Sequence, residues 1–150
     1  MTFELLDANV WFALAYRRHV HHSAAMRWIE GRTEGFLAFC RITQMALLRL
    51  LTNRKVMGQD VLAVDAAWQA YRAWKNEPDV AWLDEPPGIE PTWENLSRST
   101  PLNNLWTDAY LAAFAIGHNI QMVTFDSDFR RFESGGLRLL VLSTQTLPEP

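Results

Sequence analysis

The chain has 150 residues, and its 49% apolar and 21% charged residues are typical of a globular protein that buries its own core. At this length we expect one domain covering residues 1–150. The formal net charge of −3 excludes a globally basic protein, so a nucleic-acid partner would have to be bound by a local patch of Lys or Arg.

The cysteine count and the hydropathy of the sequence indicate the cell compartment of the protein. Cys40 is the only cysteine in the sequence, so no disulfide can form within the chain, which fits a reducing compartment. No apolar run approaches the ~20 residues of a membrane-spanning helix, and the first residues lack the pattern of a signal peptide. We therefore expect a cytoplasmic protein without membrane contact.

The first half of the chain alternates short apolar runs with stretches of helical periodicity. An apolar run over 3–6 is typical of a buried parallel strand, and Asp7 ends it where a helix over 8–16 begins. The pattern then predicts five further elements, namely a helix capped by Ser23, a strand over 35–40, a helix over 42–52, a loop over 53–59 and a helix over 62–75.

The second half repeats this alternation. It predicts a strand over 80–83, a Pro- and Gly-rich loop over 86–91, helices over 93–98 and 102–117, a strand over 121–126, a turn over 126–132 and a strand over 137–142. Gly117 is expected near the C-terminus of its helix. Strands that alternate with helices predict a three-layer α/β/α fold, in which a parallel sheet lies between helices on both faces.

Two of the predicted helices carry a polar residue on a stripe that is otherwise apolar. Gln44 shares the stripe of Leu47, Leu48 and Leu51, and Asp108 lies on a similar stripe of the later helix. The helix dipole favours a carboxylate in the first turn of a helix, but it does not explain why Asp108 should point inward. Both positions are therefore candidates for a functional site.

The predicted topology brings these residues to one edge of the sheet. A helix that follows a parallel strand begins at the carboxyl edge, which places Gln44 there. A helix that precedes a strand runs antiparallel to it, so Asp108 lies at the same edge. Asp7 and Asp126 end their own strands there, and Asp128 follows two residues later. Ligands bind outside this edge in such folds, so we expect these side chains to form the site.

Carboxylates gathered in this way repel one another and raise each other's pKa values. A cation among them would relieve the repulsion, and oxygen ligands favour Mg²⁺ or Mn²⁺ over zinc. Such an ion lowers the pKa of water and stabilises charge on a phosphoryl oxygen. Thr107 and Thr124 lie close in sequence to Asp108 and Asp126, where their hydroxyls can support the site by hydrogen bonds.

Four segments of the chain resemble, in order and spacing, the four motifs of PIN-domain ribonucleases, and more narrowly the VapC toxins of bacterial VapBC toxin–antitoxin systems. The segments read LLDANVWFAL, TQMALLRLLTN, WTDAYLAAFA and VTFDSDF. The resemblance implies a PIN-like parallel sheet of about five strands in the order 3-2-1-4-5. It also implies an endoribonuclease that hydrolyses RNA, such as tRNA or rRNA, by a water activated by Mg²⁺ or Mn²⁺. A cognate VapB antitoxin and a homodimer are implied as partners.

Carried over by motif, Asp7, Asp108 and Asp126 fall on the acidic metal-site positions of the family, and Asp128 falls on an additional acidic position. Gln44 departs from the pattern, because the related motif reads T-E-L-G-F-L-R-L and has a glutamate there. An amide oxygen can still bind a metal or its water, but one negative charge is lost. We therefore expect Asp7, Asp108, Asp126 and Gln44 to serve catalysis, with weaker metal affinity than a glutamate would give.

Other interpretations of the same residues stay open. Asp7 can cap the helix that follows it, and Gln44 can hydrogen-bond a backbone group inside the core. Gln44 also favours a catalytically weakened PIN-like module that only binds its antitoxin or RNA. An aspartyl phosphohydrolase with Asp7 as the nucleophile is a further alternative, although Ala8 and Asn9 follow where a second aspartate is needed.

The remaining basic residues give weaker signals. The histidines at 19, 21 and 22 have no Cys or carboxylate spacing that would complete a metal site, so we expect a solvated turn. Arg49 lies about 140° around its helix from Gln44, so we expect it to make no direct contact with the site.

Overall fold

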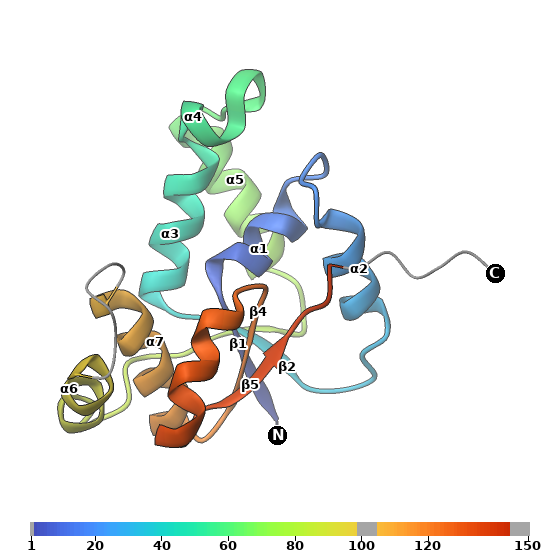
Figure 1. Ribbon diagram of the computed structural model, residues 1–150. Coiled ribbons are helices and arrows are strands. Elements are labelled where there is room, and N and C mark those ends of the chain that lie inside the picture. Colours follow the sequence, from blue (N-terminus) through green and yellow to red (C-terminus); the bar gives the residue numbers. More distant parts are fainter. Residues whose placement is uncertain (1, 99–104, 145–150) are drawn as a thin grey trace.

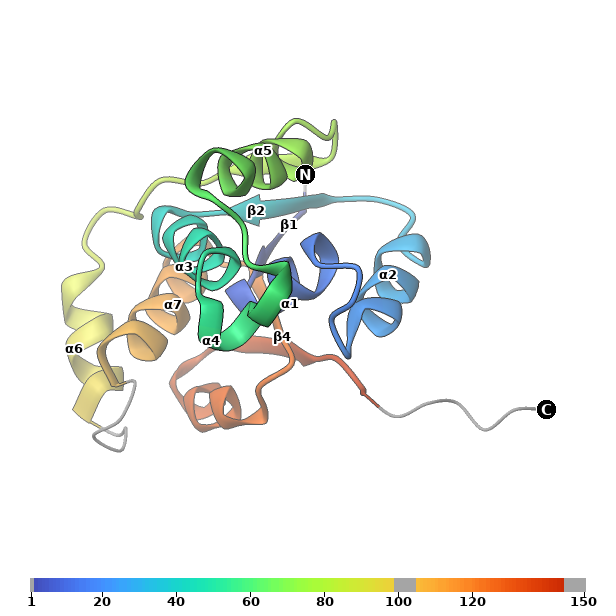
Figure 2. The same cartoon turned by 90° about the horizontal axis from the view of Figure 1, so that it is seen from above.

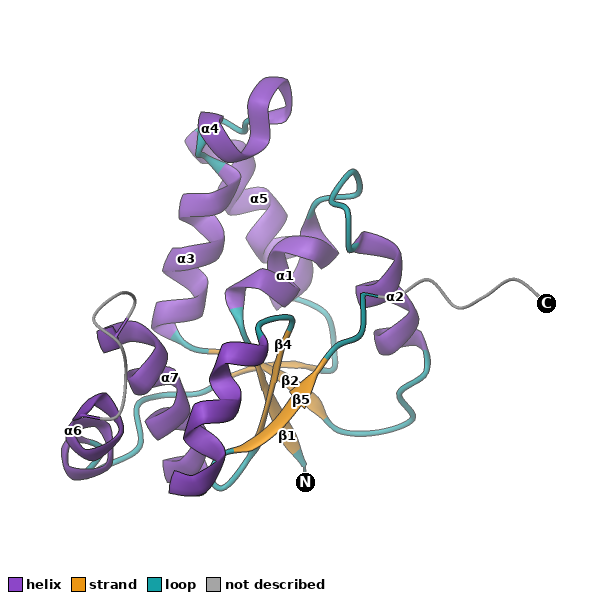
Figure 3. Ribbon diagram, in the orientation of Figure 1, coloured by secondary structure: helices purple, strands orange, loops and turns teal. Residues whose placement is uncertain are grey.

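Five parallel strands form one sheet at the centre of the protein. The structure, a computed structural model, describes residues 2–98 and 105–144. The strand order is β3-β2-β1-β4-β5, and every pairing is parallel, which confirms the predicted order (Figure 3). The strands are β1 Phe3–Leu6, β2 Phe36–Phe39, β3 Val80–Trp82, β4 Gln121–Thr124 and β5 Arg138–Val141.

Helices cover both faces of the sheet, so the three-layer prediction is also confirmed (Figures 1 and 2). One face packs against α1 Ala8–Ala15, α2 His22–Glu30, α3 Arg41–Leu51 and α5 Val64–Lys75. The other face packs against α6 Glu90–Arg98, α7 Leu105–His118 and the 3₁₀ helix η2 Ser127–Gly135. Two short helices, α4 Arg54–Met57 and η1 Gly58–Asp60, join α3 to α5.

The alternation of side chains along the strands divides the core between these two layers. Leu6 and Val123 point to the layer of α1 and α3, whereas Leu5 and Met122 point to the layer of α7. All four side chains are completely buried. In the first layer the Trp11 ring stacks on a neighbouring phenylalanine of β2, with the ring centroids 3.8 Å apart. Burial of β1 on both faces explains its continuous apolar sequence.

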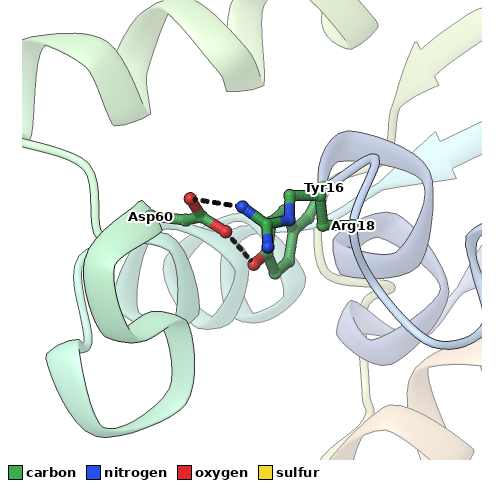
Figure 4. Close-up of polar contacts among 3 residues, drawn as sticks. All are labelled: Tyr16, Arg18 and Asp60. Carbon is green, nitrogen blue, oxygen red and sulfur yellow. Dashed lines mark hydrogen bonds and ion pairs between the residues drawn. The ribbon is translucent and has the colours of Figure 1, made fainter.

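Figure 4 shows how the end of α1 is tied to η1. The Tyr16 hydroxyl donates a hydrogen bond to Oδ2 of Asp60, and Nη1 of Arg18 lies 3.5 Å from Oδ1 of the same carboxylate. Since Arg18 is largely exposed, solvent screens its ion pair. The hydrogen bond from Tyr16 therefore contributes more than the ion pair to holding the end of α1 against η1.

The structure differs from the predicted elements at several places. The helix predicted over 93–98 begins already at Glu90, inside the predicted loop over 86–91. The predicted loop over 53–59 contains α4 and most of η1, because a helix of four residues is too short to show periodicity. Ser23 does not cap its helix, which starts one residue earlier with His21 at the N-cap. The predicted helix over 102–117 runs on to His118, and Asn119 has a φ of 55° after it. Its predicted start at 102–104 lies outside the described residues.

None of the helices in the described part of the chain is both long and apolar enough to cross a bilayer.

Candidate active site

Asp7 is held at the carboxyl edge of the sheet by two hydrogen bonds. Its Oδ1 accepts from the backbone N–H of Ala8 at 2.7 Å, so the carboxylate caps α1. Its Oδ2 accepts from the hydroxyl of Thr124, the last residue of β4, at 2.8 Å. The side chain thus joins the ends of two neighbouring strands, and the predicted support from Thr124 is confirmed.

The Thr124 hydroxyl also organises the loop after β4. It accepts a hydrogen bond from Nδ2 of Asn9 at 3.1 Å and another from the backbone N–H of Asp126 at 3.0 Å. Oδ1 of Asn9 accepts from the backbone N–H of Phe125 at 3.2 Å. Asp126 in turn caps η2, because its Oδ1 accepts from the backbone N–H of Asp128 at 2.9 Å. This network fixes Asp126 relative to Asp7.

The electrostatics of the three aspartates show that they are close neighbours. Burial raises the pKa of Asp7 to about 6, against the lowering effect of its hydrogen bonds from Thr124 and Ala8, and the charge of Asp126 raises it further. Burial likewise raises the pKa of Asp108, in the first turn of α7, to about 6, and the charges of Asp7 and Asp126 add to the shift. The structure thus brings Asp7, Asp108 and Asp126 together.

A hollow of about 430 Å³ opens between α1, α3 and α7, and Asp7 and Asp108 line it. In Figures 1 and 2, α3 and α7 lie on the same side of α1. Thr107 of α7 adds a hydroxyl group to the wall and Arg49 adds a guanidinium group, whereas the hydroxyl of Thr43 on α3 is buried and bonded to the backbone of Cys40. The hollow therefore offers carboxylates, a hydroxyl and one cation to a ligand.

A larger hollow of about 680 Å³ lies at the opposite, amino edge of the sheet and is lined by Glu4, His118 and Arg138. All three of these groups are already engaged within the protein. Glu4 accepts a 2.7 Å hydrogen bond from Arg32, and Nε2 of His118 lies 2.7 Å from the carbonyl oxygen of Asp84. Nη2 of Arg138 donates to the carbonyl oxygen of Asn119. We therefore place the candidate site at the carboxyl edge, where carboxylates with raised pKa values converge.

Gln44 is not among the residues that line the hollow with Asp7 and Asp108. It is buried, its Oε1 accepts a 2.7 Å hydrogen bond from Nη1 of Arg41, and its side chain also hydrogen-bonds to Tyr71 of α5. The stripe that Gln44 shares with the leucines of α3 packs into the core. Gln44 therefore makes internal hydrogen bonds, as the second interpretation of this residue expected, but its partners are side chains and not a backbone group.

Arg49 lines the same hollow as Asp7 and Asp108, although its charge is not among those that shift the pKa of Asp108. The angle of about 140° around the helix axis between Arg49 and Gln44 is correct. It does not place Arg49 relative to the hollow, because Gln44 faces the core instead of the site. Thr43, Ala46 and Arg49, spaced three residues apart, form the face of α3 that lines the hollow.

Asp128 lies at the rim and faces solvent, with 71% of its side chain exposed. Nη2 of Arg131 is 3.7 Å from its Oδ2, and Nε of Arg131 donates to its backbone carbonyl at 2.8 Å. The charges of both residues reach Asp108, whose pKa Arg131 lowers and Asp128 raises. Asp128 thus belongs to the surroundings of the carboxylates but does not line the hollow.

The donor set fits a hydrated hard cation. Within residues 2–98 and 105–144, no three His, Cys, Asp or Glu side chains form a ready-made metal site. Mg²⁺ commonly keeps several waters and uses only one or two protein carboxylates, which Asp7 and Asp108 supply at the hollow. The raised pKa values of both groups reflect burial and repulsion that a bound cation would offset.

The sequence pattern gave no role at the site to Asn9 or Arg49. Asn9 lies inside an apolar helix, and an amide in the first turn of such a helix is a signal that could have been used. Arg49 interrupts a leucine-rich helix, but which face of that helix meets the site depends on packing.

Comparison with known proteins identifies the family. Residues 5–134 match the model of the PIN domain. Ribonuclease VapC41 of Mycobacterium tuberculosis is 42% identical over 142 residues, which cover 91% of this chain and 97% of the relative. Ribonuclease VapC29 of the same organism is 32% identical over 143 residues, which cover 93% of this chain and 97% of that protein.

Solved structures agree on the fold. VapBC2 from Rickettsia felis, crystallised with a DNA fragment from their promoter, aligns with a TM-score of 0.67 at 13% identity and covers 95% of this chain and 100% of its own. VapC20 from Mycobacterium tuberculosis, a toxin that cleaves the sarcin–ricin loop, aligns with a TM-score of 0.63 at 21% identity, over 89% of this chain and 95% of its own. Together with the family match, these findings show that the chain belongs to the PIN-domain family and, within it, to the VapC proteins.

Proposed function

We propose that the chain is the toxin of a VapBC pair and hydrolyses RNA phosphodiester bonds with the help of Mg²⁺ or Mn²⁺. Its relatives at 42% and 32% identity are ribonucleases by name. The observation that carries the proposal is the convergence of Asp7 and Asp108 on one hollow, with the charge of Asp126 acting on both. Carboxylates that are far apart in sequence and share one edge are the donors that such an ion needs.

Asp7, Asp108 and Asp126 are the residues that would hold the ion. When bound, a divalent cation supplies Lewis-acid chemistry, which acidifies water and offsets negative charge on a phosphoryl oxygen. The chain itself orients the groups around the substrate. Thr124 and the Ala8 N–H fix both oxygens of Asp7, and Asn9 fixes the backbone that presents Asp126.

A carboxylate at the hollow can also accept a proton during hydrolysis, and Asp108 lines the hollow beside Thr107. We infer that a carboxylate oxygen of Asp108 accepts a proton from the attacking water. The water oxygen then bonds to phosphorus, one P–O bond of the RNA backbone breaks, and the leaving oxygen takes up the proton that Asp108 accepted.

The test is the Asp7→Asn variant, incubated with total RNA and Mn²⁺ and followed by sequencing of the RNA ends. We expect cleavage by the wild type and none by the variant, because the amide removes a charge that holds the ion. Circular dichroism and binding to VapB serve as controls for folding. Cleavage by the variant at the wild-type rate would refute the assignment of Asp7.

A VapB antitoxin is the expected partner, since structural neighbours from Rickettsia felis and Haemophilus influenzae were solved as VapBC. We propose that VapB binds this chain and blocks the hollow, and that two copies of the chain form a dimer. Co-expression with the antitoxin from a neighbouring gene should give a complex that does not cleave RNA, and light scattering of the free toxin should give the mass of a dimer.

A binding module without catalysis is the second candidate. It is favoured by α3, which contributes Thr43, Ala46 and Arg49 but no carboxylate to the described wall of the hollow. This candidate predicts that the purified wild-type chain cleaves no RNA in Mn²⁺ while it still binds VapB.

A further inference from the structure

Arg49 is the one basic side chain among the described residues that line the hollow. It is exposed, and its guanidinium group makes no hydrogen bond or ion pair with any described residue. Other arginines of the chain are engaged, as Arg41 is with Gln44 and Arg32 with Glu4. The guanidinium of Arg49 therefore keeps all its donors available for a ligand in the hollow.

Arg49 stands apart from the carboxylates along the same hollow. Thr43 lies in the first turn of α3, beside the end of β2, and Arg49 lies in its last turn. The six residue steps from Thr43 to Arg49 correspond to about 9 Å along the helix axis. The charges that shift the pKa of Asp108 belong to Asp7, to the loop after β4 and to η2, and do not include Arg49. The hollow thus has an acidic end and a basic end.

This polarity matches a phosphodiester chain. A protein of net charge −3 with a carboxylate cluster repels RNA, so a strand that reaches the carboxylates needs a cation beside it. A guanidinium group binds a phosphate through two parallel hydrogen bonds, which fixes position as well as charge. Because Arg49 lines the hollow from the last turn of α3 while the carboxylates line it from α7 and the start of α1, Arg49 can hold a phosphate next to the one being cleaved.

We infer that Arg49 binds a phosphate that flanks the scissile bond and so aligns the RNA strand along α3, with the scissile phosphate at Asp7 and Asp108. This inference rests on the proposed nuclease function. It makes Arg49 a substrate-binding residue that sets where along the strand the cut falls.

A purely structural role for Arg49 makes a different prediction. A basic residue in the last turn of a helix is favoured by the helix dipole, and a lysine there would serve equally well. Lysine keeps the charge but cannot form the two parallel hydrogen bonds to one phosphate. Arg49→Ala and Arg49→Lys therefore separate the two roles.

The experiment measures RNA binding without cleavage. In the Asp7→Asn background, a fluorescein-labelled single-stranded RNA oligonucleotide of mixed sequence is titrated at increasing KCl, and its anisotropy is recorded. Arg49→Ala should weaken binding about tenfold at low salt and reduce the slope of log K against log[KCl] by about 0.7, the value of one phosphate contact on a single strand. Arg49→Lys should keep the slope but restore only part of the affinity.

Arg27→Ala is the matched control. Arg27 is an exposed arginine of α2 whose guanidinium makes no hydrogen bond or ion pair with the described residues, and α2 lies on the other side of α1 from α3 (Figure 1). Its replacement should leave both slope and affinity unchanged. Equal thermal midpoints of the variants show that loss of binding is not loss of folding.

Three results would overturn the inference. The first is a slope for Arg49→Ala equal to that of Arg27→Ala. The second is full recovery of affinity by Arg49→Lys, which assigns Arg49 to the helix end. The third is unchanged RNA binding together with lost binding of VapB, which assigns the guanidinium to the protein partner. Absence of RNA binding by the Asp7→Asn parent together with absence of RNA cleavage by the wild type would instead contradict the proposed function, on which this inference depends.

Discussion

Thr124 links three parts of the candidate site through one hydroxyl group. It donates to Asp7 and accepts from Asn9 and from the backbone N–H of Asp126, and it is completely buried. A buried hydroxyl with three partners holds all of them in place, because none can turn away without losing a bond that water does not replace. Support of this kind from a neighbouring residue normally affects metal affinity and activity.

Replacing Thr124 by valine keeps the shape of the side chain and removes the hydroxyl. We expect RNA cleavage in Mn²⁺ to fall about 10- to 100-fold, because Asp7 loses a hydrogen bond and its pKa rises further. Thr124→Ser should restore most of the activity, since it returns the hydroxyl. Wild-type kcat/KM in the valine variant would show that the network does not serve the reaction.

The raised pKa of Asp7 also predicts how stability depends on pH in the absence of metal. The pKa is about 6 in the folded protein and about 4 in an unfolded chain. The folded state therefore binds the proton more tightly, so this contribution to stability is complete below about pH 4 and is lost as the pH rises through 6.

Asp7→Asn removes this dependence and retains a good helix cap. In EDTA at neutral pH the variant should be more stable than the wild type by about 1–3 kcal/mol, and the difference should vanish near pH 4. Thermal melts at both pH values measure it. A variant that is less stable than the wild type at neutral pH would contradict the unfavourable burial of this carboxylate.

At the scale of elements, α3 shows how one helix divides its faces between core and site. Its leucine stripe, with Gln44, packs against α1 and α5, while Thr43, Ala46 and Arg49 line the hollow. Periodicity in the sequence defines both stripes, but it does not tell which of them meets the carboxyl edge, because that depends on where α1 and α5 dock.

This division predicts different effects for two glutamate substitutions in α3. Ala46→Glu places a carboxylate in the hollow and should increase Mn²⁺ affinity about tenfold, by added attraction to the cation. Gln44→Glu places its charge beside Arg41 in the core and should leave Mn²⁺ affinity unchanged. Calorimetric titration of both variants checks this, and tighter binding by Gln44→Glu alone would reverse the assignment of the two faces.

At the scale of the whole molecule, the alternation of strands and helices is enough to predict the parallel sheet and its two helical layers. It also predicts that Asp7, Asp108 and Asp126 meet at one edge, because the position of a helix start or a strand end follows from topology. Gln44 and Arg49 could not be placed in this way, since a helix position alone does not identify the neighbours of its side chain. The short helix α4 was not predicted, because four residues are too few to show the repeat of apolar residues that is typical of a helix.

The central claim is that Asp7, Asp108 and Asp126 hold one divalent cation. Calorimetric titration of Mn²⁺ into the wild type and into single Asp→Asn variants tests it most directly, with the exposed Asp65 of α5 as the control position. We predict that Asp65→Asn binds like the wild type and that each of the other three variants loses binding. Wild-type affinity in the variants at 7 and 108 would show that the carboxylates at this edge do not bind the ion.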